Sequence, residues 1–254
     1  MKLTEYNKII SANWKMNGSY SLVNKFLGYF SKNFNKINNS RGIIFCPPFP
    51  YLSFFTEITS KFSNFYIGGQ DCSIKDNSSR TGEISSKILK DVGCEFVILG
   101  HSERRMLNNE TDKIVSQKVS RSLENDLKVI VCVGESEKEK NDSKTFDIIK
   151  SQLENSLIDI CSPENTIIAY EPIWAIGSGK LPSLNEIENI FFEIHKIMDN
   201  KFKNANKNKF KILYGGSVNP KNSNSILTSS NIDGVLVGGS SLIIEDFYNI
   251  VNFD

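Results

Sequence analysis

Eight short apolar or β-branched runs recur along the chain, each separated from the next by a longer segment. The runs are almost continuously apolar instead of alternating with polar residues, which is typical of parallel strands covered on both faces. This pattern predicts strands at residues 9–14, 42–46, 65–69, 96–99, 128–133, 166–170, 211–214 and 234–237.

The segments between these runs carry helical periodicity, and two have clear helix-start signals. Thr111 precedes Asp112, and Ser183 is followed three residues later by Glu186, as in a capping box. Strand followed by helix, eight times, predicts an α/β fold in which one (β/α)8 barrel fills residues 1–254 as a single domain. An open doubly wound sheet is the alternative, because the same alternation permits it. Helices are expected at residues 19–34, 85–92, 111–124, 145–157, 184–202 and 240–251.

The composition excludes several classes of function. The 254 residues carry 30 Lys and Arg against 29 Asp and Glu, a formal net charge of +1. A protein dedicated to nucleic acid or to membrane surfaces needs a basic excess to attract phosphate groups, and this chain has none. There is neither a signal-peptide pattern nor an apolar run long enough to span a bilayer, and the five scattered cysteines form no Cys-x-x-Cys pair. We expect a cytoplasmic protein with buried, reduced thiols that acts on small metabolites.

A glycine pair follows each of the last two expected strands. Bare backbone N–H groups at Gly215-Gly216 and Gly238-Gly239 can approach an anion, with a helix N-terminus behind them. One such pair alone would indicate a tight turn. Two pairs after strands seven and eight lie where barrels commonly hold phosphate, and they predict a phosphate site. The run at 177–180 resembles the tail of a nucleotide-binding loop but lacks its first glycine and its final Ser or Thr, so we expect no nucleotide site.

Three chemically active side chains directly follow other strands. We expect the helix N-terminus after His101 to lower the pKa of this imidazole and keep it neutral. Glu171 ends a strand and is held by Pro172, which points its carboxylate into the barrel mouth as a general base requires. Lys15 directly follows a strand, and the sequence is equally consistent with a functional ammonium group and with an ordinary solvated lysine in a turn. Beside a phosphate site, this combination predicts proton abstraction next to the carbonyl of a phosphosugar.

The segment after Glu171 has the composition of a lid. It begins with proline, continues with four apolar residues and reaches Gly-Ser-Gly before Lys180. Closure of such a lid would exclude water, which protects an enediolate from losing its neighbouring phosphate. An apolar loop packed permanently on the barrel is the alternative.

Five motifs, in order along nearly the whole chain, resemble those of the triosephosphate isomerase family. They are Asn-Trp-Lys-Met-Asn from Asn13, Gly-His-Ser-Glu-Arg-Arg from Gly100, Tyr-Glu-Pro-Ile-Trp-Ala-Ile-Gly-Ser-Gly-Lys from Tyr170, Tyr-Gly-Gly-Ser-Val from Tyr214 and Gly-Val-Leu-Val-Gly-Gly-Ser-Ser-Leu from Gly234. The resemblance implies the TIM barrel fold and the isomerisation of triose phosphates in glycolysis and gluconeogenesis, without metal or cofactor. The neutral histidine and the closing lid are properties of this family itself.

The same resemblance assigns roles to particular residues. Glu171 becomes the base, His101 the neutral electrophile and Lys15 the cation that stabilises the enediolate. Asn13 would bond the same substrate oxygens. The implied phosphate donors are Gly177, Ser217, Gly238 and Gly239, and the implied supporting residues are Glu103 beside the lysine with Ile176 and Leu236 around the base.

A homodimer is also implied by the resemblance. The loop around Thr81 would enter the neighbouring subunit and brace the residues of the first motif, with Met16 and Arg104 near the contact. The family usually has an aromatic residue before Thr-Gly-Glu, and this chain has Arg80, which exchanges apolar burial for charge. Ser178 also replaces the usual threonine of the lid, and keeps the hydroxyl. Two alternatives stay open, a Schiff-base aldolase or lyase and a non-catalytic phosphometabolite-binding dimer.

Overall fold

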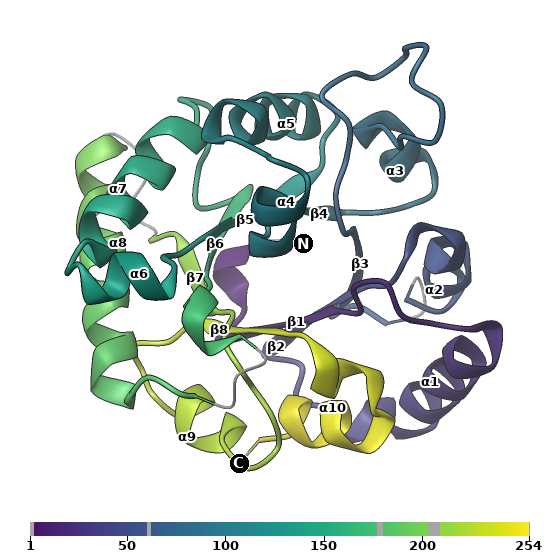
Figure 1. Cartoon of the computed structure of the whole chain (residues 1–254). Helices are drawn as coiled ribbons and strands as arrows, with labels where there is room; N and C mark the ends of the chain where they lie inside the picture. Colours follow the sequence, from purple (N-terminus) through teal and green to yellow (C-terminus); the bar gives the residue numbers. More distant parts are fainter. Residues whose placement is uncertain (1–2, 60–61, 177–179, 203–208, 254) are drawn as a thin grey trace.

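A computed structural model describes residues 3–59, 62–176, 180–202 and 209–253 of the chain. Within these residues, eight parallel strands form a closed barrel in sequence order, and helices surround it (Figure 1). The open doubly wound sheet is excluded, because the last strand pairs with the first. The strands are β1 (Lys8–Asn13), β2 (Arg41–Cys46), β3 (Phe65–Gly69), β4 (Phe96–Leu99), β5 (Lys128–Val133), β6 (Thr166–Tyr170), β7 (Lys211–Tyr214) and β8 (Gly234–Val237).

The long helices follow the sequence signals closely. Thr111 caps α5 by accepting the Ile114 N–H, and Ser183 and Glu186 form the expected capping box of α8. The last expected helix divides into a 3-10 turn, Gly239–Leu242, and a separate α10. The helices of the described residues are α1 (Tyr20–Asn33), α2 (Leu52–Thr59), α3 (Ser86–Asp91), α4 (Ser102–Leu107), α5 (Asp112–Glu124), α6 (Glu137–Asn141), α7 (Thr145–Ser156), α8 (Leu184–Lys201), α9 (Ser223–Leu227) and α10 (Ile244–Val251).

No bounds were predicted for four of these helices, α2, α4, α6 and α9. They have five to eight residues, which is too short for an apolar period to repeat. No helix of the described residues is long and apolar enough to cross a membrane. The five cysteines are all buried and free, as expected.

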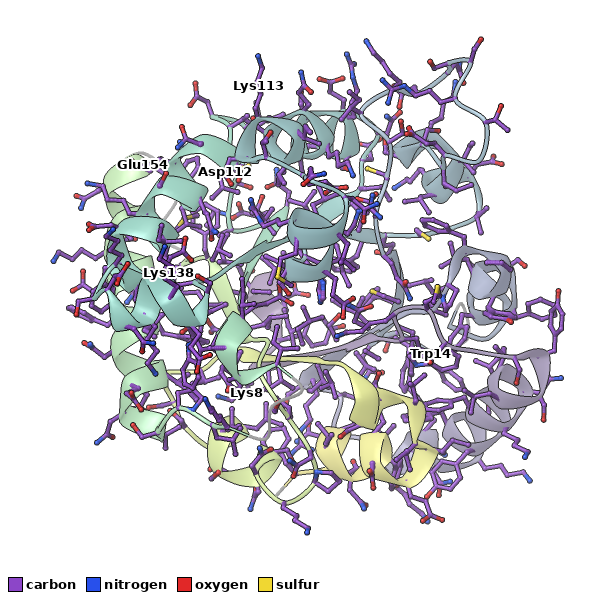
Figure 2. All side chains as sticks on the ribbon, in the orientation of Figure 1. Lys8, Trp14, Asp112, Lys113, Lys138 and Glu154 are labelled. Atoms are coloured by element: carbon purple, nitrogen blue, oxygen red, sulfur yellow. The ribbon has the colours of Figure 1, made fainter. Side chains whose placement is uncertain are left out.

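Side chains of the strands alternate between two separate cores. One set packs against the helices, together with Trp14 directly after β1, which packs edge-on against Phe26 of α1 and Phe55 of α2. Figure 2 shows Trp14 between strands and helices, and Lys113 and Glu154 pointing outward from the helical layer. The other set fills the barrel, and we call it the interior column. Its strand members are Ile9, Ile44, Cys46, Tyr66, Phe96, Ile98, Ile130, Cys132, Ile167, Ala169, Leu213 and Leu236.

The seam that closes the barrel leaves no room for a side chain. Ile9 of β1 pairs with Gly234 of β8. A Cβ at Gly234 would lie 1.8 Å from the Ile9 carbonyl oxygen, a backbone atom that cannot move aside without breaking the ladder. Glycine at this position is therefore a condition for closure.

We expect Gly234→Ala to lower the free energy of unfolding by about 3 kcal/mol or more, because the added methyl overpacks the closing seam. The control is Gly28→Ala in α1, where nothing lies within 4 Å of an added Cβ. That change should stabilise the protein by about 0.5–1 kcal/mol through helix propensity. Urea unfolding of both variants measures the difference, and a Gly234→Ala variant as stable as Gly28→Ala would contradict the role of the seam.

Candidate active site

A pocket of about 270 Å³ opens at the carboxyl ends of the strands. Because every strand of a parallel barrel ends on this face, residues far apart in the sequence meet here. Nine of the predicted site residues line the pocket: Asn13, Lys15, His101, Glu171, Ile176, Ser217, Leu236, Gly238 and Gly239. Gly177 lies outside the described residues, and Glu103 and Thr81 do not line the pocket.

Glu171 is buried beneath the pocket and held at both carboxylate oxygens. Its Oε1 lies 2.9 Å from Nε2 of His101, and its Oε2 accepts the backbone N–H of Ser102 at 2.8 Å. Burial raises the pKa of Glu171, but the neighbouring imidazole, the Ser102 N–H and Lys15 together outweigh it, so the pKa is lowered. The carboxylate is thus ionised and almost without solvent.

His101 is the N-cap residue of α4. Its Nδ1 accepts the backbone N–H of Glu103 at 3.2 Å, which leaves the proton of the neutral imidazole on Nε2, facing Glu171. Burial lowers the pKa of His101, but the adjacent Glu171 carboxylate raises it by more. The expected lowering by the helix N-terminus was therefore wrong for this arrangement, because a carboxylate in direct contact outweighs the end of a helix of six residues.

Lys15 has a left-handed backbone conformation, with φ of 53°. Such a conformation costs a non-glycine residue about 1 kcal/mol or more and persists only where neighbours fix it. Asn13 Oδ1 accepts the Lys15 N–H at 3.1 Å, and Gln70 Nε2 donates to the carbonyl oxygens of Lys15 and Cys46, both at 2.9 Å. The ammonium group pairs with Glu103 at 2.7 Å. The backbone is thus fixed so that the side chain reaches the pocket.

Sequence reasoning missed Gln70 and the Ser102 amide. Gln70 directly follows β3, so its place after a strand was a usable signal. The Ser102 N–H carried none, because every residue except proline has this group.

The glycine-rich loops form the opposite side of the pocket. Gly238 lies close to the lysine, since a Cβ there would be 3.5 Å from Cε of Lys15. Gly239 begins the 3-10 turn that follows β8. The Ser217 hydroxyl donates to the Ala175 carbonyl at 2.7 Å, so it joins the loop after β7 to the segment after β6. The two glycine pairs and the lysine thus surround one space.

The first part of the predicted lid packs on the loop after β5. Trp174 donates its indole N–H to Glu135 Oε1 at 2.8 Å, and the Lys140 ammonium lies 3.3 Å from the centre of the indole ring system. Burial raises the pKa of Glu135, against the lowering effect of the Trp174 hydrogen bond. Residues 177–179 lie outside the described residues, so lid closure stays a prediction.

The loop that contains Thr81 extends away from the pocket. Thr81 and Met16 are exposed, and the Arg80 guanidinium pairs with Glu83 of the same loop at 3.5 Å. Arg104 pairs with Asp71 at 2.9 Å and with Glu110 at 2.6 Å. Among the described residues, no group of three or more His, Cys, Asp or Glu side chains is arranged to hold a metal ion.

The contact between Glu171 and His101 gives a measurable pH dependence. We expect the pKa of His101 to lie above 6.5 in the native protein and below 6.5 in Glu171→Gln, where burial and Lys15 still lower it and the carboxylate is gone. Imidazole NMR shifts followed against pH measure both values, and His195 of α8, whose pKa burial lowers, is the internal control. An unchanged His101 titration would contradict this account.

The same shifts set the sign of the stability change. The raised pKa of His101 gives a contribution that is present below pH 6.5 and lost as pH rises through the folded-state pKa. The lowered pKa of Glu171 gives one that is present above pH 4.5 and lost as pH falls through its folded-state value.

Comparison with known proteins agrees with this geometry. A family model described as triosephosphate isomerase matches residues 8–254. The chain is 39% identical to the triosephosphate isomerase of Alkaliphilus oremlandii over 96% of this chain and 98% of that protein, and 40% identical to that of Yarrowia lipolytica over 96% of each. The crystal structure of triosephosphate isomerase from Bartonella henselae superposes with a TM-score of 0.84 at 35% identity, covering 96% of this chain and 97% of that one. The chain therefore belongs to the triosephosphate isomerase family of isomerases.

Proposed function

We propose that this chain interconverts D-glyceraldehyde 3-phosphate and dihydroxyacetone phosphate through an enediolate, without metal or cofactor, in the glycolysis and gluconeogenesis of the cytoplasm. One observation carries the proposal. A buried, ionised carboxylate, an imidazole with its Nε2 turned toward it and an ammonium group meet in one pocket beside two glycine-rich loops. Proton transfer between adjacent carbons requires this set of groups.

Glu171 is the base in this mechanism. Its carboxylate leaves His101 and the Ser102 N–H, takes the proton from one substrate carbon and returns it to the neighbouring carbon, so the base is regenerated. Its burial supports this role, because a carboxylate with little hydration has little water to lose before it reacts. Ile176 and Leu236, which line the pocket, would keep the base dry.

His101 and Lys15 act on the substrate oxygens. Once Glu171 turns to the substrate, His101 loses the contact that raises its pKa, while burial and Lys15 still lower it. The imidazole is then neutral and donates from Nε2 to the carbonyl oxygen, and it exchanges protons between the two oxygens of the enediolate. Lys15, fixed by its clamped backbone and assisted by the Asn13 amide, stabilises the negative charge on these oxygens.

The glycine-rich loops would hold the substrate phosphate. Gly238 and Gly239 can offer backbone N–H groups without a side chain in the way, and Ser217 lies beside them on the pocket wall. Gly177 is the fourth proposed donor, carried by the resemblance alone. The phosphate does not react, so the free energy of binding it would serve to orient the reacting carbons of the substrate.

We propose a homodimer as the working form. The exposed Thr81 loop would brace Asn13 and Lys15 of the second copy, and the exposed Met16 would be covered there. Arg80 weakens this contact, because a guanidinium at the interface must be desolvated.

The reaction is tested by conversion of glyceraldehyde 3-phosphate in the presence of a chelator, coupled to reduction of the dihydroxyacetone phosphate formed. We expect turnover by the native protein and a loss of about 10²- to 10⁴-fold or more in Glu171→Gln, with phosphoglycolate binding retained, because only the base is removed. Glu154→Gln, at an exposed residue of α7 that pairs only loosely with Lys150 of the same helix, is the matched control and should leave turnover unchanged.

Two outcomes would overturn the assignment. Turnover that persists in Glu171→Gln would contradict the assignment of Glu171 as the base. If borohydride and substrate then form a covalent adduct with the protein, the enzyme is a Schiff-base lyase. A native protein that binds phosphoglycolate and has no turnover would instead be a phosphometabolite-binding protein.

The dimer contact gives a further prediction. We expect Arg80→Tyr to tighten dimerisation by about tenfold, because an aromatic ring replaces a charge that must be desolvated. Sedimentation at low micromolar concentration measures the monomer fraction of both proteins. Lys87→Tyr, on an exposed residue of α3, is the control for a general effect of an added aromatic ring. A native protein without detectable monomer, or a weaker Arg80→Tyr dimer, would contradict the prediction.

A further inference from the structure

A short segment before the family match lies inside the fold. The match begins at residue 8, and residues 3–5 form a 3-10 turn just before it. Figure 1, which looks along the barrel, shows this purple segment within the ring of strands. We call residues Leu3–Tyr6 the stopper.

The contacts of the stopper join it to the amino end of the barrel. Leu3 has no exposed surface and belongs to the interior column. The Tyr6 hydroxyl lies 2.7 Å from that of Tyr66 in β3, and the two rings meet edge-on at 6.1 Å. Both hydroxyls also reach the Ser63 carbonyl, at 3.2 Å from Tyr6 and 2.7 Å from Tyr66. The partly buried hydroxyls of this tyrosine pair thus bond to each other and to the backbone before β3.

Two glycines lie beside the first interior residue of β1. Ile9, the first interior residue of β1, pairs with Gly42 of β2 on one side and with Gly234 of β8 on the other. Gly234 has no room for a side chain and Gly42 contributes none, so close packing of this layer depends on another group. Leu3 is an apolar side chain of the right kind, fully buried in the same cluster.

The interior column connects this layer to the active site. At its upper end, Leu236 lines the pocket. Cys132 of the same column lies near the base, and burial together with the Glu171 carboxylate raises the pKa of its thiol. A gap at the amino end would therefore loosen a stack of side chains that reaches the pocket through Leu236.

We propose that the stopper closes the amino end of the barrel and keeps the interior column packed up to the floor of the pocket. This role does not depend on which reaction the pocket catalyses. It adds a stabilising element that precedes the residues matched by the family model.

The test compares three variants with the native protein: Leu3→Ala, Tyr6→Phe and deletion of residues 1–6. We expect Leu3→Ala to lower the melting temperature by about 4 °C or more, as for a fully buried leucine. Ile160→Ala, at an exposed apolar residue, is the control and should change it by less than about 2 °C. Tyr6→Phe keeps the ring and loses only the hydroxyl, so it should give a smaller fall while the fold is retained.

Alkylation of the native thiols shows where the effect acts. Cys46 and Cys132 belong to the interior column, whereas Cys161 packs in the outer core between barrel and helices. We expect the deletion to raise alkylation of Cys46 and Cys132 by about fivefold or more relative to Cys161, because local opening of the barrel exposes them. Mass spectrometry of labelled peptides gives the three rates in one sample.

Two results would overturn the proposal. If Leu3→Ala lowers the melting temperature no more than Ile160→Ala does, Leu3 does not close the amino end of the barrel. Equal acceleration of Cys46, Cys132 and Cys161 in the deletion variant would show a general loss of stability with no specific effect on the interior column.

Discussion

The pairing of β8 with β1 is the constraint on which the rest of the structure depends. It turns an eight-stranded sheet into a barrel, and it succeeds because Gly234 lets two backbones approach where any side chain would collide with Ile9. Closure removes both edges of the sheet and divides the strand side chains between an interior column and an outer core. It also brings all carboxyl ends to one face, so residues from the first strand and the last share one pocket.

The charged groups of the pocket fix one another's protonation states and orientations. Glu171 and His101 shift each other's pKa in opposite directions while they are in contact, and in each residue this contact outweighs the opposing effect of burial. Lys15 carries backbone strain that two amide side chains fix in place. Such groups are oriented before substrate arrives, so little reorganisation is needed during the reaction.

The barrel is closed differently at its two ends. At the carboxyl end, long loops leave a polar pocket whose floor is the top of the interior column. At the amino end, a leucine and a pair of tyrosines 60 residues apart in the sequence fill the opening. The side chains of the interior column are thus packed by the stopper at the amino end and lie next to the polar groups of the pocket at the carboxyl end, where Cys132 is near Glu171.

The sequence by itself determined the eight strands, the longer helices with their caps and the residues that meet at the pocket, because apolar periodicity and strand ends are local properties. The bounds of short helices such as α6 and α9 were not predicted, because five residues are too few to show the helical repeat of apolar residues. The closed barrel was also predicted, and the β1–β8 pairing confirmed it against the open sheet that the same alternation permits. Only the tertiary structure decided that Glu171 contacts His101 and reverses the expected direction of the histidine pKa shift, and that Gln70 fixes the Lys15 backbone. Contacts between segments distant in sequence set these features, and no local pattern encodes them.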